Sequence, residues 1–321
     1  MQKSKNGVPS AAGPLFRDAA AAWIASLQPR AKESTVNKYA NTLEAYILPW
    51  LGDVRTDALG PEPVEALCRR LLLEGGVSGT GLSSKTVAGV LSVIRSVLCF
   101  SGSDAALRLA NLRPPRKARR RELRVLSRSE QARLCAYLFA HPEPGSIGIL
   151  LSLFAGLRVG EVCALRWEDV SFSEGTVHVC RTMQRIQDKS GGQTRTKVVV
   201  TDPKSPCSVR TIPLPEPLIP ILAAYKSGEG YSLTNSDLRY MEPRTMQNCF
   251  KRTLKECGVA DANYHALRHT FATRCVELGF DVKSLSEILG HSSVGITMDR
   301  YVHPSLDMKR DNMRLLDRLM V

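Results

Sequence analysis

The chain has 321 residues, enough for two domains that each bury a core. Its 44 Lys and Arg against 31 Asp and Glu leave a formal net charge of +13, whereas an apolar share of 43% is ordinary. Such a cationic excess repels itself in a compact fold, so it usually serves an anionic partner. Nucleic acid is the leading candidate. An acidic membrane surface is the alternative, but no basic amphipathic helix with a clean apolar face supports it.

Targeting signals and cysteine spacing favour a cytoplasmic protein without membrane association. Residues 1–13 predict a flexible polar tail that lacks the apolar stretch of a signal peptide. The longest apolar run, residues 147–157, is too short to span a bilayer. No two of the nine cysteines are separated by two residues, which excludes zinc-knuckle spacing. We expect a reduced protein without structural disulfides.

Residues 14–110 predict an all-α helical bundle, the first of two domains. Apolar residues recur at helical spacing in four segments. These segments are residues 16–27, 36–47, 64–71 and 87–98. Pro49 is expected to end the second helix, Pro61 to open the third and the pair Ser83-Ser84 to cap the fourth. Four short amphipathic helices with brief connections make a compact bundle.

A basic linker follows over residues 111–125. It holds seven cationic residues against a single acidic one, Glu122. The seven are Arg113, Arg116, Lys117, Arg119, Arg120, Arg121 and Arg124. Like charges at this density do not pack into a core, so a solvated linker is the plain interpretation. The sharper interpretation places the linker along a phosphate backbone, which makes these seven residues candidates for DNA binding.

Residues 126–321 predict a mixed α+β domain that is mostly helical and contains a small β-sheet. Ser127 and Glu130 match a capping box, and a buried helix is expected at residues 147–155. β-branched stretches predict three strands, with a long connection between the first two and a hairpin between the last two. The strands are residues 176–181, 196–200 and 209–214, and the connection is residues 182–196. From Arg244 onward the pattern is helical.

Two local motifs contain a cationic residue that can meet a phosphate. Arg158 follows a strongly apolar helix, where its burial is unfavourable unless an anion meets it, and Glu161 can supply that anion internally. The nearby Gly156 and Gly160 allow close backbone approach, which suits a ligand phosphate. Lys204 stands at the predicted hairpin tip, where a lysine is usually just solvated but can also reach a scissile bond.

Two further motifs combine histidine with arginine or tyrosine. His265 and Arg268 lie three residues apart, so both side chains can converge from one helical face on one anion. His265 and His269 also have the spacing of a metal-binding pair, but the glutamate of zinc proteases is missing beside His265. His291 precedes a short predicted helix that carries Tyr301, and such a tyrosine taken alone is normally a core residue.

Together these motifs supply two arginines, one lysine, two histidines and one tyrosine. Arginine forks match phosphate oxygens bidentately, and their hydrogen bonds strengthen as charge develops around the phosphorus. A tyrosine hydroxyl, with an unperturbed pKa of about 10, needs a cationic field or a base before it attacks. No acidic triad typical of two-metal nucleases accompanies the set. The set can break a phosphodiester without a metal and keep the bond energy in a covalent protein–DNA ester.

The motifs resemble the active-site signature of the tyrosine recombinase (phage integrase) family. The matching residues are Arg158, Lys204, His265-x-x-Arg268, His291 and Tyr301, in that order. The sequences that flank these residues also match the family. They are Leu-Arg-Val-Gly-Glu at 157–161, Leu-Arg-Trp-Glu-Asp-Val at 165–170 and Leu-Gly-His-Ser-Ser at 289–293. The resemblance runs from about residue 14 to the end. It implies a core-binding domain at 14–110 and a catalytic domain at 126–321 with a C-terminal tail.

By this resemblance, Tyr301 is the nucleophile of the reaction. It is expected to attack the scissile phosphate and to leave a 3′-phosphotyrosine and a free 5′-hydroxyl. Arg158 and Arg268 are expected to hold the non-bridging oxygens. Lys204 is expected to protonate the departing 5′-oxygen.

The resemblance also implies supporting roles and an assembly. His265 is expected to assist proton movement at the nucleophile, His291 to donate to the phosphate and Glu161 to order the site. The partners are double-stranded DNA recombination sites. The enzyme is expected to be a homotetramer on two duplexes, which exchange strands through a Holliday junction, and a monomer or weakly self-associating without DNA.

Each end of the chain allows two interpretations. The tail after Tyr301 carries Leu315, Leu316 and Leu319 at helical spacing and packs either onto a neighbouring protomer or back onto its own domain. Longer integrases carry an N-terminal arm-binding domain, whereas only about thirteen residues precede the core-binding region here. The chain is therefore either a recombinase without arm sites or a truncated form.

The function expected from these features is a site-specific recombinase, the integrase of a mobile genetic element. The long connection at 182–196 and the strong basicity favour this assignment. A chromosome-dimer-resolving recombinase and a type IB topoisomerase-like enzyme, which shares the chemistry, are the alternatives. A DNA-binding protein that has lost catalysis is a third, against which the intact six-residue set argues.

Overall fold

The structure, a computed structural model, describes most of the chain in two compact units. The described residues are 13–76, 79–113, 123–188, 195–203, 205–302, 310, 313–314 and 316–317. The units are Met1–Arg120 and Arg121–Val321, which we call the N-terminal unit and the C-terminal unit. The division between them falls inside the predicted linker of residues 111–125.

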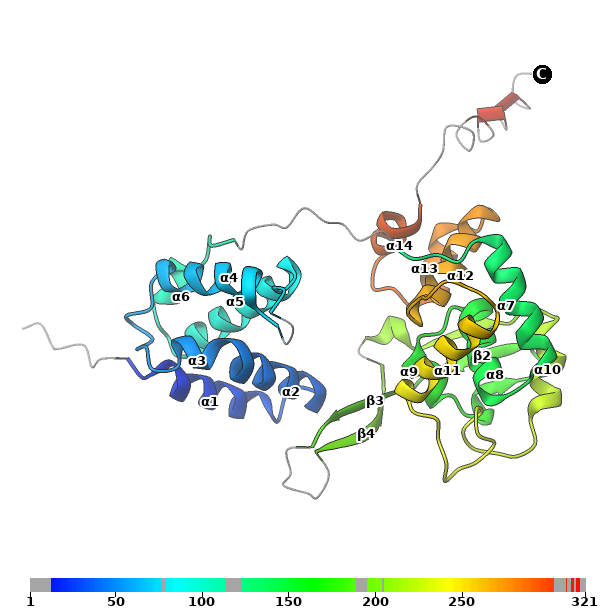
Figure 1. The fold of residues 1–321 in the computed structure, drawn as a ribbon, viewed down its shortest axis with the longest axis horizontal. Coiled ribbons are helices and arrows are strands. Elements are labelled where there is room, and N and C mark those ends of the chain that lie inside the picture. The colour runs from blue at the N-terminus through cyan, green and yellow to red at the C-terminus, as the bar shows by residue number, and fades with distance from the viewer. Residues whose placement is uncertain are drawn as a thin grey trace, which may run out of the picture. The chain divides into compact units, whose positions relative to one another are not determined.

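The N-terminal unit is built from helices (Figure 1). They are α1 (Phe16–Leu27), α2 (Glu33–Thr42), the π-helical turn η1 (Leu43–Ile47), α3 (Leu48–Leu51), α4 (Pro61–Glu74), α5 (Ser84–Phe100) and α6 (Ala105–Arg108). The four predicted helical segments are confirmed. Pro61 is the first residue of α4, and the side chain of Ser83 caps α5 by accepting a hydrogen bond from the Thr86 N–H at 3.1 Å.

The expected helix end at Pro49 is wrong, because the helical path continues to Leu51. Ahead of the proline the helix widens into the π turn, in which the Leu48 N–H bonds to the Leu43 carbonyl, five residues back. Pro49 is therefore the second residue of a new helical segment, α3. The first turn of a helix tolerates a residue that lacks an N–H group.

Helix α5 lies at the centre of the N-terminal unit, where it packs against α1 and α4. Its residues Val87, Ile94 and Leu98 are completely buried. Burial of each such side chain contributes roughly 1.5–3 kcal/mol to folding. Among the described residues of this unit, the buried polar side chains are the uncharged Asn37 and Thr56. The unit is therefore held together by an apolar core.

The C-terminal unit is mostly helical, as predicted, with a minor β component. Its helices are α7 (Arg128–Ala140), α8 (Pro144–Ala155), α9 (Val159–Ala164), α10 (Leu218–Tyr225), α11 (Pro243–Glu256), α12 (His265–Glu277), α13 (Val282–Leu289) and α14 (Val294–Tyr301). The 3-10 turns are η2 (Trp167–Asp169) and η3 (Pro206–Ser208). The capping box at the start of α7 is confirmed, since Ser127 and Glu130 exchange hydrogen bonds at 3.1 and 2.8 Å.

The strands form two small antiparallel sheets rather than one. They are β1 (Val170–Ser171), β2 (Thr176–Val179), β3 (Thr182–Gln187), β4 (Thr196–Thr201) and β5 (Arg210–Pro213), in the sheets β1-β2-β5 and β3-β4. The predicted connection at 182–196 is wrong over its first half, because residues 182–187 form β3 and pair with β4 (Figure 1). The predicted hairpin between β4 and β5 is also wrong, since β5 pairs with β2.

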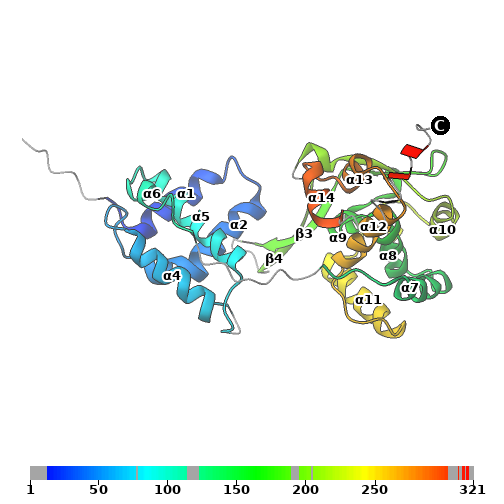
Figure 2. The same ribbon diagram turned by 90° about the horizontal axis from the view of Figure 1, so that it is seen from above.

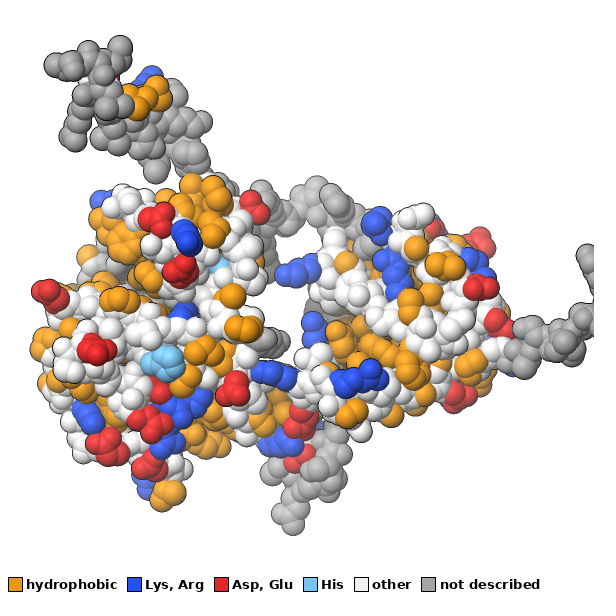
Figure 3. Space-filling view, turned by 180° about the vertical axis from the view of Figure 1, so that it is seen from behind, with side chains coloured by type: hydrophobic (Ala, Val, Ile, Leu, Met, Phe, Trp, Pro, Cys, Tyr) orange, Lys and Arg blue, Asp and Glu red, His pale blue; other side chains and the backbone are white. Residues whose placement is uncertain are grey.

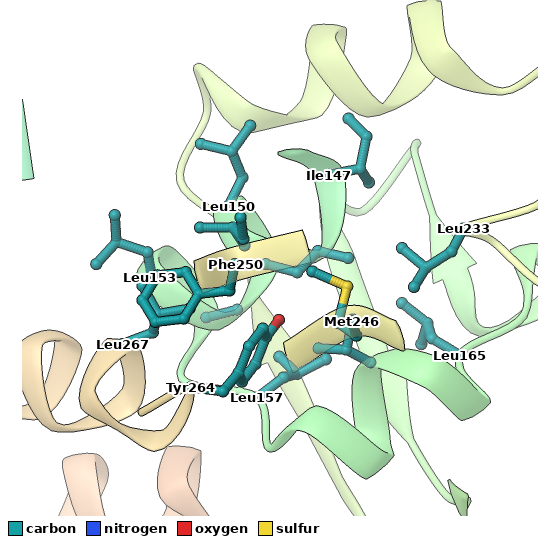
Figure 4. Close-up of a cluster of buried hydrophobic side chains, with 14 of the residues drawn as sticks. Ile147, Leu150, Leu153, Leu157, Leu165, Leu233, Met246, Phe250, Tyr264 and Leu267 are labelled. Carbon is teal, nitrogen blue, oxygen red and sulfur yellow. The ribbon is translucent and has the colours of Figure 1, made fainter. Parts of the chain in front are cut away.

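Helix α8 lies at the centre of the C-terminal unit and contacts α7, α9, α11 and α12. The predicted buried helix is thus confirmed. In Figure 4, Leu150 of α8 and Phe250 of α11 lie close together within the apolar cluster. The buried hydroxyl of Tyr264 accepts a hydrogen bond from Ser152 at 2.9 Å and donates one to the Gly148 carbonyl at 2.8 Å. The single polar atom of this side chain therefore has both a donor and an acceptor as partners.

The last three described helices, α12, α13 and α14, pack against one another (Figure 2). They share a small apolar cluster of Ala272, Cys275, Leu285, Leu289 and Tyr301. Tyr301 ends α14, so this packing fixes its ring against the other two helices.

Three further observations concern helix length, the cysteines and the surface. In the part of the chain that the structure describes, no helix is long and apolar enough to cross a membrane. All nine cysteines are free thiols in this structure. On the face of the C-terminal unit that Figure 3 shows, Lys and Arg side chains lie beside Asp and Glu side chains. This face is therefore mixed in charge rather than uniformly basic.

Candidate active site

The turn from α8 into α9 positions Arg158. Helix α8 ends at Gly156, whose φ of +66° is left-handed, and a Cβ there would lie 2.6 Å from a ring carbon of Phe271. A Cβ on Gly160 would lie 2.6 Å from the Met183 carbonyl oxygen. Protein atoms fill both spaces. The predicted role of these glycines, to let a ligand phosphate approach, is therefore wrong.

Glu161 is buried and binds two arginines. One of its oxygens accepts a hydrogen bond from the Arg158 guanidinium at 2.6 Å, and the other accepts one from the Arg158 backbone N–H at 2.9 Å. Arg210, the first residue of β5, also donates to Glu161 at 2.9 Å. Burial raises the pKa of Glu161, but the two guanidinium groups outweigh burial and hold the pKa at about 2. The carboxylate is therefore ionised and fixes the Arg158 fork.

Sequence reasoning missed Arg210 as a member of this site. Its buried guanidinium also donates to the carbonyls of Ile288 at 2.6 Å and Ser208 at 3.0 Å, which ties β5 to the end of α13. A signal was present, because Arg210 and Ile212 alternate with exposed residues along β5 and so point inward. A cation at an inward position of a strand indicates a buried carboxylate partner.

Arg268 is a buried cation without a carboxylate partner. Its side chain in α12 is 1% exposed, and it donates to the Gly156 carbonyl at 2.7 Å and to the Leu289 carbonyl. Burial, helped by the charge of Arg158, lowers the pKa of Arg268 to about 9, so the group stays charged at neutral pH. No described carboxylate forms an ion pair with it. A buried charge met only by carbonyl dipoles is strongly stabilised when an anion arrives.

His291 lies on the loop between α13 and α14. It follows Gly290, which ends α13 in the left-handed conformation at φ +60°. The Nδ1 atom of His291 lies 2.8 Å from the Thr297 hydroxyl, and its ring is parallel to that of Tyr301 at 6.4 Å between centroids. Burial and the neighbouring guanidinium groups lower the pKa of His291 to about 3, which keeps it neutral at pH 7.

Tyr301 is nearly buried, and its hydroxyl lies 2.8 Å from Nδ1 of His269. Burial raises the pKa of Tyr301, whereas the charges of Arg268 and Arg300 lower it. Sequence reasoning considered His269 only as a metal ligand and missed it as a site residue. Its position directly after Arg268 in α12 was the available signal.

His265 differs from the other two histidines. It is the first residue of α12 and its side chain is exposed. Its ring meets that of His269 edge-on, with centroids 4.5 Å apart, but it forms no hydrogen bond with any described residue. The structure thus brings His269, rather than His265, to the Tyr301 hydroxyl. Among the described residues, no group of three or more His, Cys, Asp or Glu side chains is arranged to hold a metal ion.

Several predicted residues cannot be placed in the site. Lys204 and five linker residues lie outside the described residues. The five are Arg116, Lys117, Arg119, Arg120 and Arg121. Two of the seven cationic linker residues are described, and the first of them, Arg113, is exposed and donates to the Ala110 carbonyl at 3.2 Å. Arg124 forms an ion pair with Glu130 at 2.6 Å, so its charge is already engaged at the start of α7. DNA contact by the linker stays a prediction.

The assembled groups have a clear chemical character. The guanidinium groups of Arg158, Arg210 and Arg268 face a single carboxylate, Glu161, which leaves an excess of positive charge. Neutral imidazoles and the phenol of Tyr301 surround this charge. The arrangement is suited to bind an anion such as a phosphate and to place a tyrosine oxygen beside it.

Two family models match the chain. Residues 125–307 match the phage integrase family, and residues 16–80 match the phage integrase central domain. The first match covers more than half of the 321 residues.

Curated relatives support the same family. A "tyrosine recombinase XerC-like" protein of Caldanaerobacter subterraneus is 30% identical over 191 residues, which cover 54% of this chain and 49% of the relative. A "putative prophage phiRv2 integrase" of Mycobacterium tuberculosis is 24% identical over 325 residues, which cover 96% of this chain and 79% of the relative. The chain therefore spans about half the length of the first relative and most of the second.

Solved structures share the fold. A Tn1549 transposon integrase in complex with circular intermediate DNA aligns with a TM-score of 0.75 at 18% identity, over 94% of this chain and 99% of that one. A lambda integrase tetramer bound to a Holliday junction aligns with a TM-score of 0.62 at 16% identity, over 94% and 85%. The predicted fold class is thereby confirmed. The chain belongs to the phage integrase family and is a tyrosine recombinase of that family.

Proposed function

We propose that this recombinase is the integrase of a mobile genetic element, which cleaves and rejoins double-stranded DNA at specific sites. One observation carries the proposal. Arg268 is a buried cation without a carboxylate partner, and it lies close enough to Tyr301 for its charge to act on the phenol. A backbone phosphate would supply the missing anion, and the phenol beside it would supply the nucleophile.

In the proposed reaction, the Tyr301 oxygen bonds to phosphorus while the bond from phosphorus to the 5′-oxygen breaks. The product is a 3′-phosphotyrosine with a free 5′-hydroxyl. Arg158 and Arg268 would hold the non-bridging oxygens, and His291 would donate to the phosphate. Lys204 would protonate the departing oxygen. Rejoining reverses these steps with the 5′-hydroxyl of another strand, so no external energy source is needed.

Two further residues have supporting roles in this proposal. Glu161 would act as a positioning residue, because it binds the side chain and the backbone of Arg158 at once. His265 would exchange protons at the exposed end of the site, where its ring borders His269. The reaction as written requires neither a metal nor a cofactor.

The choice of a mobile element rests on the relatives that cover most of the chain. The prophage integrase matches 96% of it, and the transposon integrase shares its fold over 94%. The XerC-like relative, more similar over a shorter span, favours a chromosome-dimer-resolving recombinase as the second candidate. A type IB topoisomerase-like enzyme would relax supercoils but would not join two sites in trans. A cytoplasmic location stays a prediction.

We further propose a homotetramer on two DNA duplexes, formed from monomers or weakly associated copies. The lambda integrase tetramer, which shares the fold, supports it. The C-terminal unit also has a largely apolar groove of about 840 Å³ between α7, α12 and the end of β5, lined by Phe154, Phe271 and Leu278 among others. The proposed occupant is the leucine-bearing tail of a neighbouring copy. Removing residues 310–321 should then abolish the tetramer on DNA, measured by analytical ultracentrifugation.

The proposed chemistry is tested with a library of suicide duplexes, nicked near random positions and incubated with the protein in EDTA. A covalent adduct that survives denaturing electrophoresis and yields phosphotyrosine is expected. Tyr301→Phe is the control, which should bind DNA nearly unchanged and form no adduct. An adduct in this variant would refute Tyr301 as the nucleophile. No adduct from the unaltered protein would favour a DNA-binding protein that has lost catalysis.

A second assay separates the candidate functions. Two labelled duplexes that carry the selected site are mixed, and strand exchange between them is measured. Joining in trans is expected for a recombinase, whereas relaxation of supercoils without joining would favour the topoisomerase-like alternative. Insertion of a circle that carries one site into a linear duplex that carries the other would support the mobile-element assignment over resolution of dimers only.

A further inference from the structure

The Tyr301 hydroxyl is held by a residue outside the predicted catalytic set. Nδ1 of His269 lies 2.8 Å from this oxygen, and both side chains are 6% exposed. His291 directs its own Nδ1 to the Thr297 hydroxyl, and His265 has no hydrogen bond with a described residue. Among the described histidines, His269 is therefore the one bonded to the oxygen that attacks in the proposed reaction.

The surroundings of the hydroxyl set the direction of this hydrogen bond. The guanidinium groups of Arg268 and Arg300 act on the phenol oxygen, and guanidinium groups can only donate. An oxygen that faces cationic donors keeps its lone pairs toward them and gives its hydrogen to an acceptor. Burial and these two arginines lower the pKa of His269 to about 4, so the ring is neutral at pH 7. A neutral ring with its proton on Nε2 presents Nδ1 as that acceptor.

Resting on the proposed function, we propose that His269 is the base that takes the phenolic proton when Tyr301 attacks the phosphate. The Oη–H bond breaks as the Oη–P bond forms, and the proton passes to Nδ1. The electron pair of the broken P–O5′ bond stays on the 5′-oxygen, which takes a proton from the proposed acid, Lys204. In rejoining, the imidazolium of His269 returns its proton to the phenolic oxygen as that oxygen leaves phosphorus.

The charges of the site make this base depend on DNA. Without DNA, the uncompensated guanidinium of Arg268 opposes a second positive charge on the adjacent imidazole. A bound phosphate adds negative charge beside Arg268, and the pentavalent transition state adds more. The bound phosphate and the charge of the transition state both raise the proton affinity of His269, at the stage when His269 has to accept the proton. The phenol stays protonated in the free protein and becomes reactive when a backbone phosphate occupies the site.

The proposal is tested with His269→Asn. The amide of asparagine can replace the hydrogen bond of Nδ1 but cannot accept a proton. Formation of the covalent adduct on a suicide duplex should slow about 10²–10⁴-fold, the usual contribution of a general base, with DNA binding retained. His178→Asn is the matched control, because Nδ1 of His178 also lies beside a hydroxyl, that of Thr211 at 3.1 Å, but on the exposed face of β2. Thermal unfolding of both variants checks the fold, and His269→Gln replaces His269→Asn if the latter does not fold.

Two chemical substitutions separate a base from a positioning residue. Fluorotyrosines at position 301 lower the pKa of the nucleophile, so the slowing caused by His269→Asn should shrink as that pKa falls. His178→Asn should leave the rate unchanged with every fluorotyrosine. The leaving group of a 5′-phosphorothiolate substrate needs no acid. This substrate should therefore restore the rate of adduct formation by Lys204→Ala but not by His269→Asn.

The outcomes distinguish this inference from the proposed function. If the unaltered protein forms the adduct and His269→Asn forms it at a similar rate, the inference is overturned while the function stands. An equal slowing with every fluorotyrosine also overturns it, because His269 would then only position the ring. If the unaltered protein forms no adduct with any duplex, the proposed function itself is refuted.

Discussion

The two units bury different kinds of side chain. In the described residues of the N-terminal unit, the buried polar groups are the uncharged Asn37 and Thr56. The C-terminal unit buries Glu161, Arg268 and His269 among others. Each buried charge carries a desolvation penalty of several kcal/mol unless partners compensate it. The first unit therefore buries an apolar core without charged groups, whereas the second also buries ionisable groups whose charges must be matched.

The difference is local rather than spread over the C-terminal unit. Around α8, the core of this unit is a large apolar cluster, part of which Figure 4 shows. The buried charges gather where α9, β5 and α12 meet the α13–α14 loop. This concentration is what functional sites show when stability is given up for preorganised charge.

The largest effect is expected from Glu161→Gln. This change leaves the guanidinium groups of Arg158 and Arg210 without their anion, so the C-terminal unit should lose about 3–5 kcal/mol of unfolding free energy. Urea unfolding followed by hydrogen exchange would measure it separately for each unit. Glu130→Gln is the matched control, because Glu130 is also the third residue of a helix and pairs with a half-exposed arginine, Arg124.

The control should lose only about 1 kcal/mol, since glutamine preserves the capping box. An N-terminal counterpart is Leu98→Ala, which should destabilise that unit by about 2–5 kcal/mol through a cavity. Equal losses for Glu161→Gln and Glu130→Gln would contradict the contrast between the units.

Arg268→Lys should slow DNA cleavage by about 10²–10³-fold, because an ammonium group cannot span the Gly156 carbonyl, the Leu289 carbonyl and a phosphate as the planar fork does. Adduct formation on the suicide duplex measures the rate. Arg274→Lys is the control, since Arg274 lies on the same helix and donates to the Leu126 carbonyl at 2.6 Å. If Arg268→Lys cleaves DNA about as fast as the control, the proposal that Arg268 holds a non-bridging phosphate oxygen is refuted.

The units should also differ in their response to pH. In the folded protein the pKa of His269 is about 4, against about 6.5 when unfolded. Between these values the unfolded chain binds more protons, so stability is complete above pH 6.5 and falls as the pH drops toward 4. For His269 the loss is at most about 3 kcal/mol.

All six histidines lie in the C-terminal unit, so the N-terminal unit should be nearly insensitive to pH between about 7 and 5. Hydrogen exchange across this range compares the two units directly. If both units lost hydrogen-exchange protection to the same extent as the pH fell, the predicted difference between them would be wrong.

The smallest effect concerns the linker between the units. Replacing Arg119 or Arg120 by glutamine should reduce the slope of log K against log salt for DNA binding by about 0.9 each, as expected for one lost phosphate contact. Fluorescence anisotropy at several salt concentrations measures the slope. Arg124→Gln should change it less, because Arg124 is paired with Glu130. An unchanged slope for Arg119 and Arg120 would leave the linker as a solvated connection.

The helices were largely predictable because their signals are local. Ser83 and Glu130 act within one helical turn of their partners, and Pro61 sets its own helix start. Strand β3 was not predictable in the same way. Its buried residues, Met183 and Ile186, are three apart and break the alternation that identifies a strand.

The pairing of the strands shows the same limit. A short segment read alone suggests a hairpin with its neighbour in sequence, as for β4 and β5. The choice of partner is made by the sheet, in which β5 joins β2 and β4 joins β3.

By itself, the sequence determined which chemical groups the protein contributes and on which helices most of them lie, because motif spacing and helix signals act over a few residues. The tertiary structure alone decided which groups meet. Glu161 pairs with Arg210 across 49 residues, and His269 meets Tyr301 across 32. Such contacts depend on how whole elements pack, and burial then decides which of them keep their charge. The choice of His269 over His265 as the partner of the nucleophile follows from that packing.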